Sequence, residues 1–323
     1  MTPLEKSKQT LKKAVFVLTA CLLLLNGGNG FAASPDGGSN GYRAVIGHGD
    51  GFVAAGSDGR IDRISLTGEI RGSERFPGAS LNCLISRGAM IAAAGDPGIL
   101  LIARDGKTFE KAESETERNI RSLALFQDYV VAGADGGVLF VGDEAGFFAE
   151  IPLEVKGNIV SLSTTDTRCY GVTDRGEILS TEDLMHWDIF NFNAFYAGYY
   201  PPRRFTGIAA TDRQIAVTGV TDEGFPTLSL SSGGDVWSER SLEYTDEQGM
   251  PAYLTEASNA IFYDAAEDRF LLACDNGRVM SIPSCSHCNE LIAFPTAESL
   301  VSISRNGDVL IVVGDKGYIG PIR

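Results

Sequence analysis

Short apolar runs separated by turn residues follow one another from about residue 42 onward. The clearest example is the pair Ile91–Ala94 and Gly98–Ala103, which is broken at Asp96-Pro97-Gly98 and followed by a second turn at Arg104-Asp105-Gly106. Apolar runs of this length, bounded by Asp, Gly and Pro, predict β-strands joined in hairpins. No stretch after the N-terminal segment has the 3.6-residue periodicity of an amphipathic helix, so we expect almost no helix.

The hairpin pattern repeats seven times. An Asp that is followed one or two residues later by Gly ends a small-residue strand at Asp58, Asp96, Asp135, Asp174, Asp222, Asp275 and Asp315. The spacings of 38, 39, 39, 48, 53 and 40 residues are typical of blade-type repeats. Each repeat divides into four short strands, A to D from the centre outward, and the seventh lacks strand D unless residues before Tyr42 supply it. We therefore predict an all-β fold, a seven-bladed β-propeller of four-stranded antiparallel blades whose last blade has three strands.

The N-terminal 33 residues have the pattern of an export signal. Four lysines precede the apolar run Ala14–Leu25, and Ala32-Ala33 provides small residues for cleavage. Because twelve apolar residues are too few to span a bilayer, we expect cleavage and no membrane insertion of the mature chain. Residues 34–41 would then be a flexible lead-in and residues 42–323 the propeller, in a periplasmic or extracellular protein. A lipid anchor at Cys21, in Leu18-Thr19-Ala20-Cys21, is the alternative.

The charge balance narrows the choice of partners. The formal net charge is −15, and removal of residues 1–33, with one acid and four bases, makes it −18. An acidic surface repels phosphate backbones and anionic headgroups, which argues against nucleic-acid and membrane-surface binding. We expect a neutral or basic protein partner, or a carbohydrate, and a monomeric propeller.

The cysteines do not indicate a disulfide framework or a metal centre. Cys83, Cys169 and Cys274 lie in or beside apolar strands and are expected in the core. Cys285-Ser-His-Cys288 lacks a second cysteine pair at zinc-ligand spacing, so a disulfide across this turn is the better interpretation. No cofactor and no metal are expected.

Three stretches carry a further pattern. Ala94–Phe109, Ser180–Trp187 and Ser232–Trp237 resemble the Asp-box, the bacterial neuraminidase repeat with the pattern Ser-x-Asp-x-Gly-x-Thr-Trp between strands C and D. With the preceding Gly-x-Asp-x-Gly-x-Ile element, the chain is most similar to the photosystem II stability/assembly factor-like propellers. The resemblance implies a propeller fold in which the acid and glycine hold a tight turn. The Arg-Ile-Pro signature of Asp-box sialidases is absent, so the resemblance does not imply catalysis.

Candidate binding residues lie where the repeats are longer than the usual 38 to 40 residues. The extra residues are 193–204, 244–258 and the turn 221–226, which we expect on one rim, at the mouth of the central channel. Aromatic and charged side chains in these insertions provide surface for a sugar or peptide and contacts to carboxylates. The candidates are Tyr196, Tyr199, Tyr200, Arg203, Arg204, Asp222, Glu223 and Tyr253.

Two functional classes stay open. The first is an exported, non-catalytic propeller that binds a protein partner, with an assembly, stability or scaffold role in the cell envelope. The second is a glycan-binding or glycoside-hydrolysing propeller, which would need two carboxylates at a defined separation. No residue is assigned a catalytic role, because only three histidines occur and no Ser-His-Asp set is evident.

Overall fold

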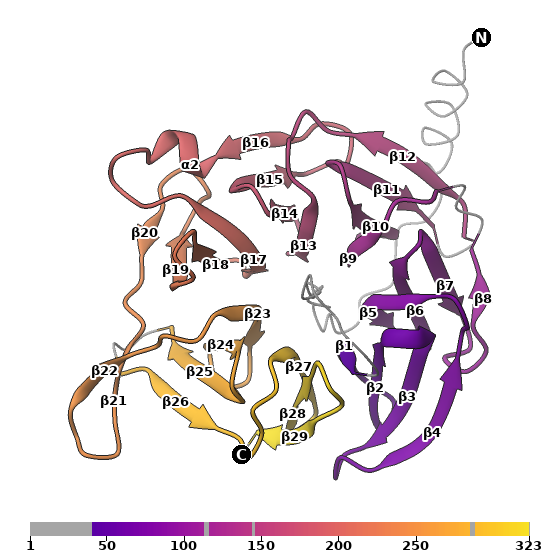
Figure 1. Cartoon of the computed structure of the whole chain (residues 1–323). Coiled ribbons are helices and arrows are strands. Elements are labelled where there is room, and N and C mark those ends of the chain that lie inside the picture. Colours follow the sequence, from indigo (N-terminus) through magenta and orange to yellow (C-terminus); the bar gives the residue numbers. More distant parts are fainter. Residues whose placement is uncertain (1–40, 113–115, 144–145, 285–287, 323) are drawn as a thin grey trace.

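The computed structural model describes residues 41–112, 116–143, 146–284 and 288–322, in which seven antiparallel sheets surround a central axis (Figure 1). Six blades have four strands and the last has three, so the predicted seven-bladed β-propeller is confirmed. Helix is limited to the single turn α2 (Phe192–Phe195) and the 3-10 turn η1 (Ser57–Gly59). The expectation of an almost helix-free chain therefore holds for the described residues.

Blades one to three follow the predicted order of strands. Blade one contains β1 (Tyr42–His48), β2 (Gly51–Gly56), β3 (Arg60–Ser65) and β4 (Ile70–Arg75). Blade two contains β5 (Ser80–Arg87), β6 (Met90–Asp96), β7 (Ile99–Ala103) and β8 (Glu110–Lys111). Blade three contains β9 (Ile120–Phe126), β10 (Tyr129–Ala134), β11 (Val138–Gly142) and β12 (Phe148–Pro152).

Blades four to seven complete the ring. Blade four contains β13 (Ile159–Thr164), β14 (Cys169–Thr173), β15 (Glu177–Thr181) and β16 (Asp188–Asn191). Blade five contains β17 (Arg203–Ala210), β18 (Ile215–Thr221), β19 (Pro226–Ser231) and β20 (Ser238–Glu239). Blade six contains β23 (Ser258–Asp264), β24 (Arg269–Cys274), β25 (Arg278–Pro283) and β26 (Glu290–Ala293). Blade seven contains β27 (Leu300–Asn306), β28 (Val309–Gly314) and β29 (Ile319–Ile322), and the hairpin β21 (Glu243–Thr245) and β22 (Pro251–Tyr253) lies between blades five and six.

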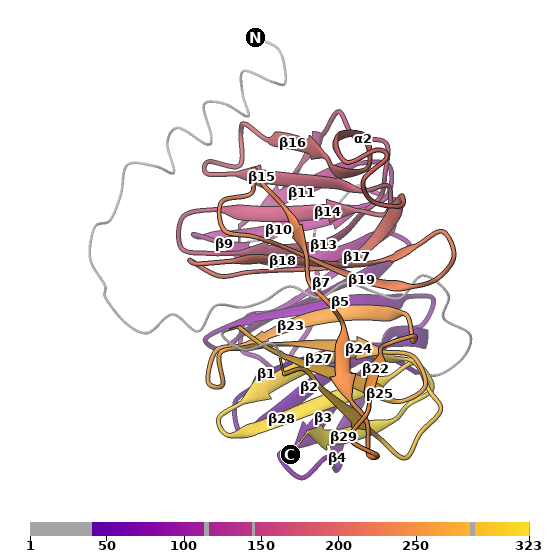
Figure 2. The same ribbon diagram turned by 90° about the vertical axis from the view of Figure 1, so that its left-hand side faces the viewer.

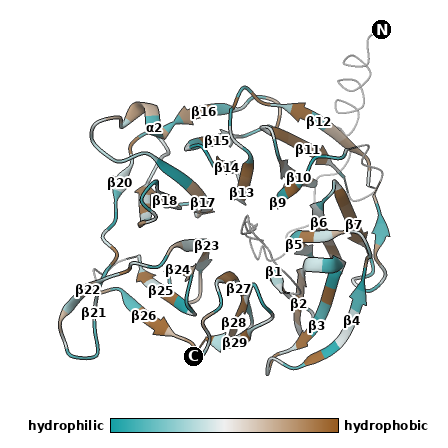
Figure 3. Ribbon diagram, viewed as in Figure 1, coloured by the Kyte–Doolittle hydropathy of each residue, from teal (hydrophilic) through white to brown (hydrophobic). Residues whose placement is uncertain are grey.

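The second strand of each blade is buried almost throughout, because it packs against neighbouring blades on both faces. β2, β14 and β18 have no exposed residue, and they consist of small, aliphatic and aromatic residues with a few buried Thr and Cys. Figure 3 shows hydrophobic strands in the blades, whereas β8 and the β21–β22 hairpin are hydrophilic. The radial stack thus covers both apolar faces of each sheet, as the repeat pattern predicts.

Two outer strands are shorter than the sequence pattern predicts. The pattern predicts Thr108–Glu113 and Val236–Leu242, but the ladders of β8 and β20 contain two residues each. Both residues of each strand are exposed. At the perimeter, side chains have solvent on one side, so packing does not extend the ladder.

Side-chain hydroxyls close the ring between blades seven and one. Ser302 Oγ accepts a hydrogen bond from the Val45 backbone N–H at 3.1 Å, and Ser304 Oγ accepts one from the Gly47 N–H at 2.9 Å. Ser302 is fully buried. These hydroxyls accept hydrogen bonds from backbone N–H groups of β1 that form no backbone hydrogen bond to a neighbouring strand.

Replacing Ser302 with Ala should therefore destabilise the propeller by about 1–3 kcal/mol, because the buried Val45 N–H loses its acceptor. Urea denaturation of the purified protein measures this free energy of unfolding. Ser232→Ala, at an exposed position, serves as the control and should change it by less than about 0.5 kcal/mol. Equal effects of the two variants would contradict the proposed role of the hydroxyl.

The outer edge of blade seven is protected by a proline. The Gly314 N–H donates to the Tyr318 carbonyl, and Ile311 lies opposite Pro321 in the β28–β29 ladder. Alternation along the ladder then directs the backbone of Pro321 away from β28, to the side where the other blades carry a fourth strand. Since proline has no N–H, it weakens this edge as a template for another strand.

The variant Pro321→Thr restores an outward N–H and should increase edge-to-edge self-association, by up to about tenfold in the association constant. Sedimentation velocity over a concentration series measures this. An unchanged distribution of monomers and oligomers would show that Pro321 does not limit pairing at this edge.

Candidate functional site

The loops between strands D and A and the turns between strands B and C lie on the same rim. In four blades the N–H of the repeated Asp donates to a carbonyl just before the A strand of the same blade, as in Asp135 to Asn119 and Asp315 to Ser299. All seven Asp-Gly markers lie in these B–C turns or, like Asp96, at the end of strand B directly before the turn. One rim of the channel therefore carries one carboxylate from each blade.

Most of these carboxylates accept hydrogen bonds that stabilise the turn in which they lie. Side-chain amides of Asn82, Asn119, Asn158 and Asn259 donate to Asp96, Asp135, Asp174 and Asp275, at 2.7 to 3.0 Å. Each of these pairs fixes the start of strand A to the end of strand B within one blade. The geometry agrees with hairpin chemistry as the role of the repeated Asp.

Every blade has a β-bulge at the start of strand A, which adds one residue near this rim. All seven A–B strand pairs have a register shift near the start of strand A. The bulged position holds Arg43, Asn82, Arg121, Val160, Thr206, Asn259 and Val301 in blades one to seven. Bulges commonly re-aim side chains. The sequence analysis missed this polar set, although positions 43, 82 and 121 recur at the 39-residue spacing of the Asp markers.

The polar groups at the channel mouth differ between the two sides of the ring. On blades one to three, Arg121 binds Asp135 through two bonds of 2.8 and 2.9 Å, and Arg43 lies 3.7 Å from Asp96. Burial lowers the pKa of Arg43, the nearby Asp96 raises it and the nearby Arg121 lowers it further. On the side of blades six and seven, burial raises the pKa of Asp315, and Glu298 and Asp275 raise it further, whereas Lys316 and the bond from the Ser299 N–H lower it.

The first insertion does not form an open binding surface at the channel. Phe192, Tyr196 and Tyr200 pack against the buried core between blades four and five, with Phe192 and Tyr196 rings 4.7 Å apart. The Tyr196 hydroxyl accepts from the Trp237 N–H at 2.9 Å and donates to the Trp237 carbonyl at 3.2 Å. Tyr196 and Tyr200 are half-buried and help to form this interface.

Arg203 is also in the interior. Its guanidinium lies over the rings of Phe192 and Tyr200, 4.8 and 5.2 Å from their centroids, and Nη1 donates to Ser229 Oγ at 3.0 Å. The residue is only 1% exposed. Arg203 is therefore not an exposed residue of the insertion in this conformation, because the aromatic rings cover it.

Four of the predicted residues are exposed around blade five. Tyr199 is 84% exposed, and Arg204, Asp222 and Glu223 are exposed as well. Arg204 lies opposite Val220 in the β17–β18 ladder, two residues before Asp222, so the structure brings Arg204 close to the acidic B–C turn. Phe225, in the same turn and 55% exposed, joins them.

The second insertion is a hairpin at the perimeter. Tyr244 bridges to Asn289, next to the outer strand of blade six, and the Asn289 side chain donates to the carbonyls of Ser241 and Glu243. Tyr253, 63% exposed, donates to Glu243 Oε2 at 2.9 Å. Figures 1 and 2 place α2 and this hairpin on the outside of the ring, on either side of blade five. The two long insertions therefore lie at the outer perimeter, whereas the sequence pattern predicts them at the channel mouth.

The turns between strands C and D share a local geometry. Asp105 Oδ1 accepts from the N–H groups of Lys107 and Thr108, and Asp183 Oδ1 accepts from those of Met185 and His186. In blades four and five, the indole N–H groups of Trp187 and Trp237 donate to the carbonyls three residues earlier. Backbone bonds hold the pKa of Asp105 below its usual value. These acids thus organise turns.

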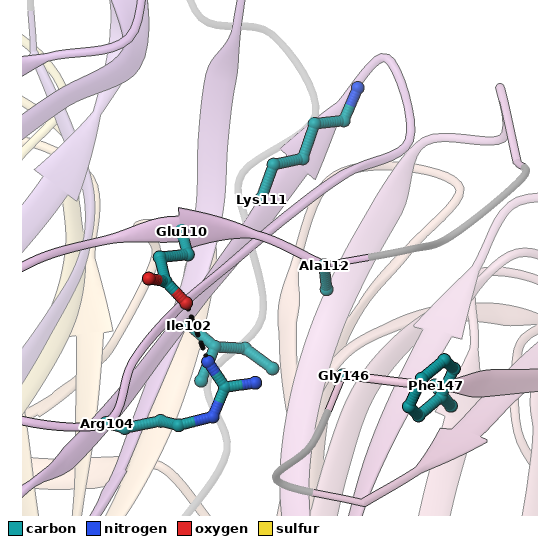
Figure 4. Close-up of a pocket in the computed structure, with 7 residues that line it drawn as sticks. All are labelled: Ile102, Arg104, Glu110, Lys111, Ala112, Gly146 and Phe147. Carbon is teal, nitrogen blue, oxygen red and sulfur yellow. Dashed lines mark hydrogen bonds and ion pairs between the residues drawn. The ribbon is translucent and has the colours of Figure 1, made fainter.

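A recess of about 170 Å³ lies at the perimeter between blades two and three (Figure 4). Arg104 Nη1 pairs with Glu110 Oε2 at 2.9 Å along one wall, and Phe147 is on the opposite side. The recess contains none of the predicted site residues. It is also smaller than pockets that enclose drug-sized ligands.

The described residues include some, but not all, of the predicted cysteine and N-terminal features. Cys83, Cys169 and Cys274 are buried, and burial raises the pKa of each thiol. Cys285 is outside the described residues, so the predicted Cys285–Cys288 disulfide is too, as are Cys21 and the signal segment. Within the described ranges, no three acidic, His or Cys side chains are grouped to hold a metal ion, and no helix is long and apolar enough to cross a membrane.

Comparison with known proteins identifies the fold. No protein family and no curated protein matches the sequence. The RRP9 WD40 repeats are similar in structure, with a TM-score of 0.67 and 14% identity over 90% of this chain and 94% of that one. The Neurospora crassa Pan2 WD40 domain has a TM-score of 0.66 and 9% identity over 85% of this chain and 86% of that one. The computationally designed Ika8 protein has a TM-score of 0.62 and 12% identity over 90% and 98%.

The protein is thus a β-propeller with the architecture of WD40 domains. At these identities, the likeness concerns the fold. It does not confirm the Asp-box or photosystem II factor-like family.

The raised pKa of Asp315 leads to a prediction about pH. A folded-state pKa above the unfolded value favours the protonated form, so ionisation of Asp315 destabilises the fold as pH rises through the folded pKa. Asp315→Asn should therefore raise the Tm at pH 7, and its advantage should shrink as the pH falls toward about 4, near the pKa of an unfolded Asp. Calorimetry of both proteins at several pH values measures this. A pH-independent difference would mean that Asp315 is not destabilised by its ionisation.

Proposed function

We propose that this protein is a non-catalytic β-propeller that binds a protein partner through the outer surface of blades four to six. One observation supports this most strongly. Of the eleven large hydrophobic side chains that are exposed among the described residues, eight lie between Met185 and Tyr253. Concentrated apolar exposure of this kind is typical of interaction surfaces.

The proposed surface has the features of an interface. Phe195, Tyr199 and Phe225 supply aromatic anchors, which are 64%, 84% and 55% exposed. Arg204 and the acidic turn at Asp222 supply charge beside them. Aromatic and arginine side chains contribute a large share of the binding energy at interfaces. Tyr253 extends the surface toward the hairpin, whereas Tyr196 and Tyr200 support it from below.

The wider role follows from the sequence. The formal net charge of −15 favours a neutral or basic partner, and the pattern of residues 1–33 supports export to the periplasm or the cell surface. The hydrogen bonds of Asp105 and Asp183 in the C–D turns support the resemblance to Asp-box propellers. Together these features favour an assembly or scaffold role in the envelope.

The proposal predicts that Tyr199→Ala with Phe225→Ala weakens partner binding and preserves the fold. Loss of a buried aromatic anchor at an interface commonly costs about 2 kcal/mol or more, so affinity should fall by at least about tenfold. Changes of exposed loop residues cost the fold little, under about 0.5 kcal/mol each. Cross-linked pull-down from the native envelope followed by titration of the purified partner measures the affinity.

The matched control is Leu66→Ala with Phe147→Ala, two exposed hydrophobic residues on blades one and three. This variant should bind the partner normally. Loss of binding in the control with retention in the loop variant would place the interface elsewhere. Hydrolysis of glycans by the purified protein, unaffected by either variant, would favour the glycoside-hydrolase alternative.

A further inference from the structure

Arg203 is an unusual interior residue. Its side chain has no exposed surface, yet Nε and Nη2 have no hydrogen-bond partner among the described residues. Glu239 Oε2 is the carboxylate oxygen paired with it, at 3.8 Å from Nη2, which is beyond hydrogen-bond range. Buried N–H groups without an acceptor cost free energy, so this arrangement requires an explanation.

The two nitrogens without a hydrogen bond, Nε and Nη2, have a specific geometry. Nε–H and one Nη2–H point in parallel and form one of the two-pronged donor sets of a guanidinium, the set that fits both oxygens of a carboxylate. Nη1, outside this set, is held by Ser229. The rings of Phe192 and Tyr200 fix the guanidinium plane. The donor pair is therefore oriented in advance for a carboxylate.

The segment that covers Arg203 forms few hydrogen bonds to the rest of the propeller, and its attachment rests mainly on the packing of the Tyr196 and Tyr200 rings. Residues 196–202, which we call the strap, form hydrogen bonds within themselves and back to Phe192. Among the described residues, the strap's hydrogen bonds to the rest of the propeller come from the Tyr196 hydroxyl, with Trp237. Few bonds and high exposure, as at Tyr199, characterise segments that open locally at low cost.

We propose that the strap is a gate, and that its opening lets a carboxylate of the partner bind the Nε and Nη2 donors of Arg203. Phe192, which lies outside the strap, flanks the bound group, and Glu239, whose side chain is 38% exposed, turns toward solvent. This inference rests on the proposed function in that it places the partner at blade five. It adds the chemistry that the partner must present.

The gate is tested by labelling with phenylglyoxal, which modifies accessible arginines. Tyr196→Phe removes both bonds to Trp237 and leaves the ring, so Arg203 should be labelled about tenfold faster than in the wild type. Arg204, which is exposed, should be labelled at the same rate in both proteins and is the internal reference. Peptide mass spectrometry measures both rates. Tyr199→Ala, which leaves the bonds to Trp237 in place, is the control and should leave the Arg203 rate unchanged.

The carboxylate site is tested with short peptides in the Tyr196→Phe protein. The probes are acetyl-Gly-Gly-Tyr-Gly-Leu with a free carboxylate, the same peptide as its amide, and acetyl-Gly-Gly-Glu-Gly-Leu-amide. Protection of Arg203 by the first probe identifies a C-terminal carboxylate, and protection by the third identifies an acidic side chain. The neutral amide should give none. Arg203→Lys, which keeps the charge and loses the paired donors, should weaken binding of the protecting peptide at least tenfold.

An unchanged labelling rate of Arg203 in Tyr196→Phe would overturn the gate. Faster labelling without protection by either carboxylate, or equal protection by the neutral amide, would overturn the carboxylate site. These outcomes do not depend on the captured partner. The gate can therefore fail while the interface around Tyr199 and Phe225 stands, and the reverse also holds.

Discussion

Strand A of each blade faces the central channel and pairs with strand B only. The stability of the ring therefore depends on what binds the backbone N–H and C=O groups on the other edge of strand A. Side chains from the neighbouring A strands form these hydrogen bonds. Ser161 and Ser163 of blade four accept from the N–H groups of Ile208 and Ala210 in blade five. Between blades two and three, the Asn82 amide donates to the Ile120 carbonyl. Short hydroxyls and amides thus replace a ladder that radial geometry does not allow, and they keep the edges from pairing elsewhere.

The same crowding at the centre produces the polar rim. Where strands A and B meet, a Cβ on Gly95 would lie 1.8 Å from the Ser80 carbonyl oxygen, so only glycine fits at the end of the B strand. The bulge opposite this contact adds a residue to strand A. That residue is Asn82 in blade two and Arg43 and Arg121 in blades one and three. The chemistry of the channel mouth is therefore a consequence of close strand packing, and it is well suited to holding the ring together.

The number of blades was predictable because each blade requires the same Asp-Gly turn after its second strand. An Asp whose carboxylate accepts amide hydrogens, followed by a Gly at positive φ, is required at each tight turn, as at Gly98 and Gly176. The outer strands were less predictable, since exposed residues such as Glu110 and Lys111 carry no packing pattern. The burial of Arg203 was not predictable from the sequence. No local pattern distinguishes an arginine packed between two rings from an exposed arginine, because the contacts that bury it are tertiary.

The insertion between blades four and five shows why length alone does not locate a binding site. β20 pairs over only two residues, and the sequence before β17 fills the adjacent space with Phe192, Tyr196 and Tyr200. Half of this insertion is thus structural. The propeller would lose buried apolar contacts without it. Phe195 and Tyr199 are the aromatic residues that packing leaves exposed within the same loop, and the neighbouring rings of Tyr196 and Tyr200 support them. In the closed strap this support holds Tyr199 in place, so the side chain loses little conformational entropy when a partner binds there. The Tyr200 ring also covers Arg203, so opening the strap changes the chemistry that blade five offers to the partner.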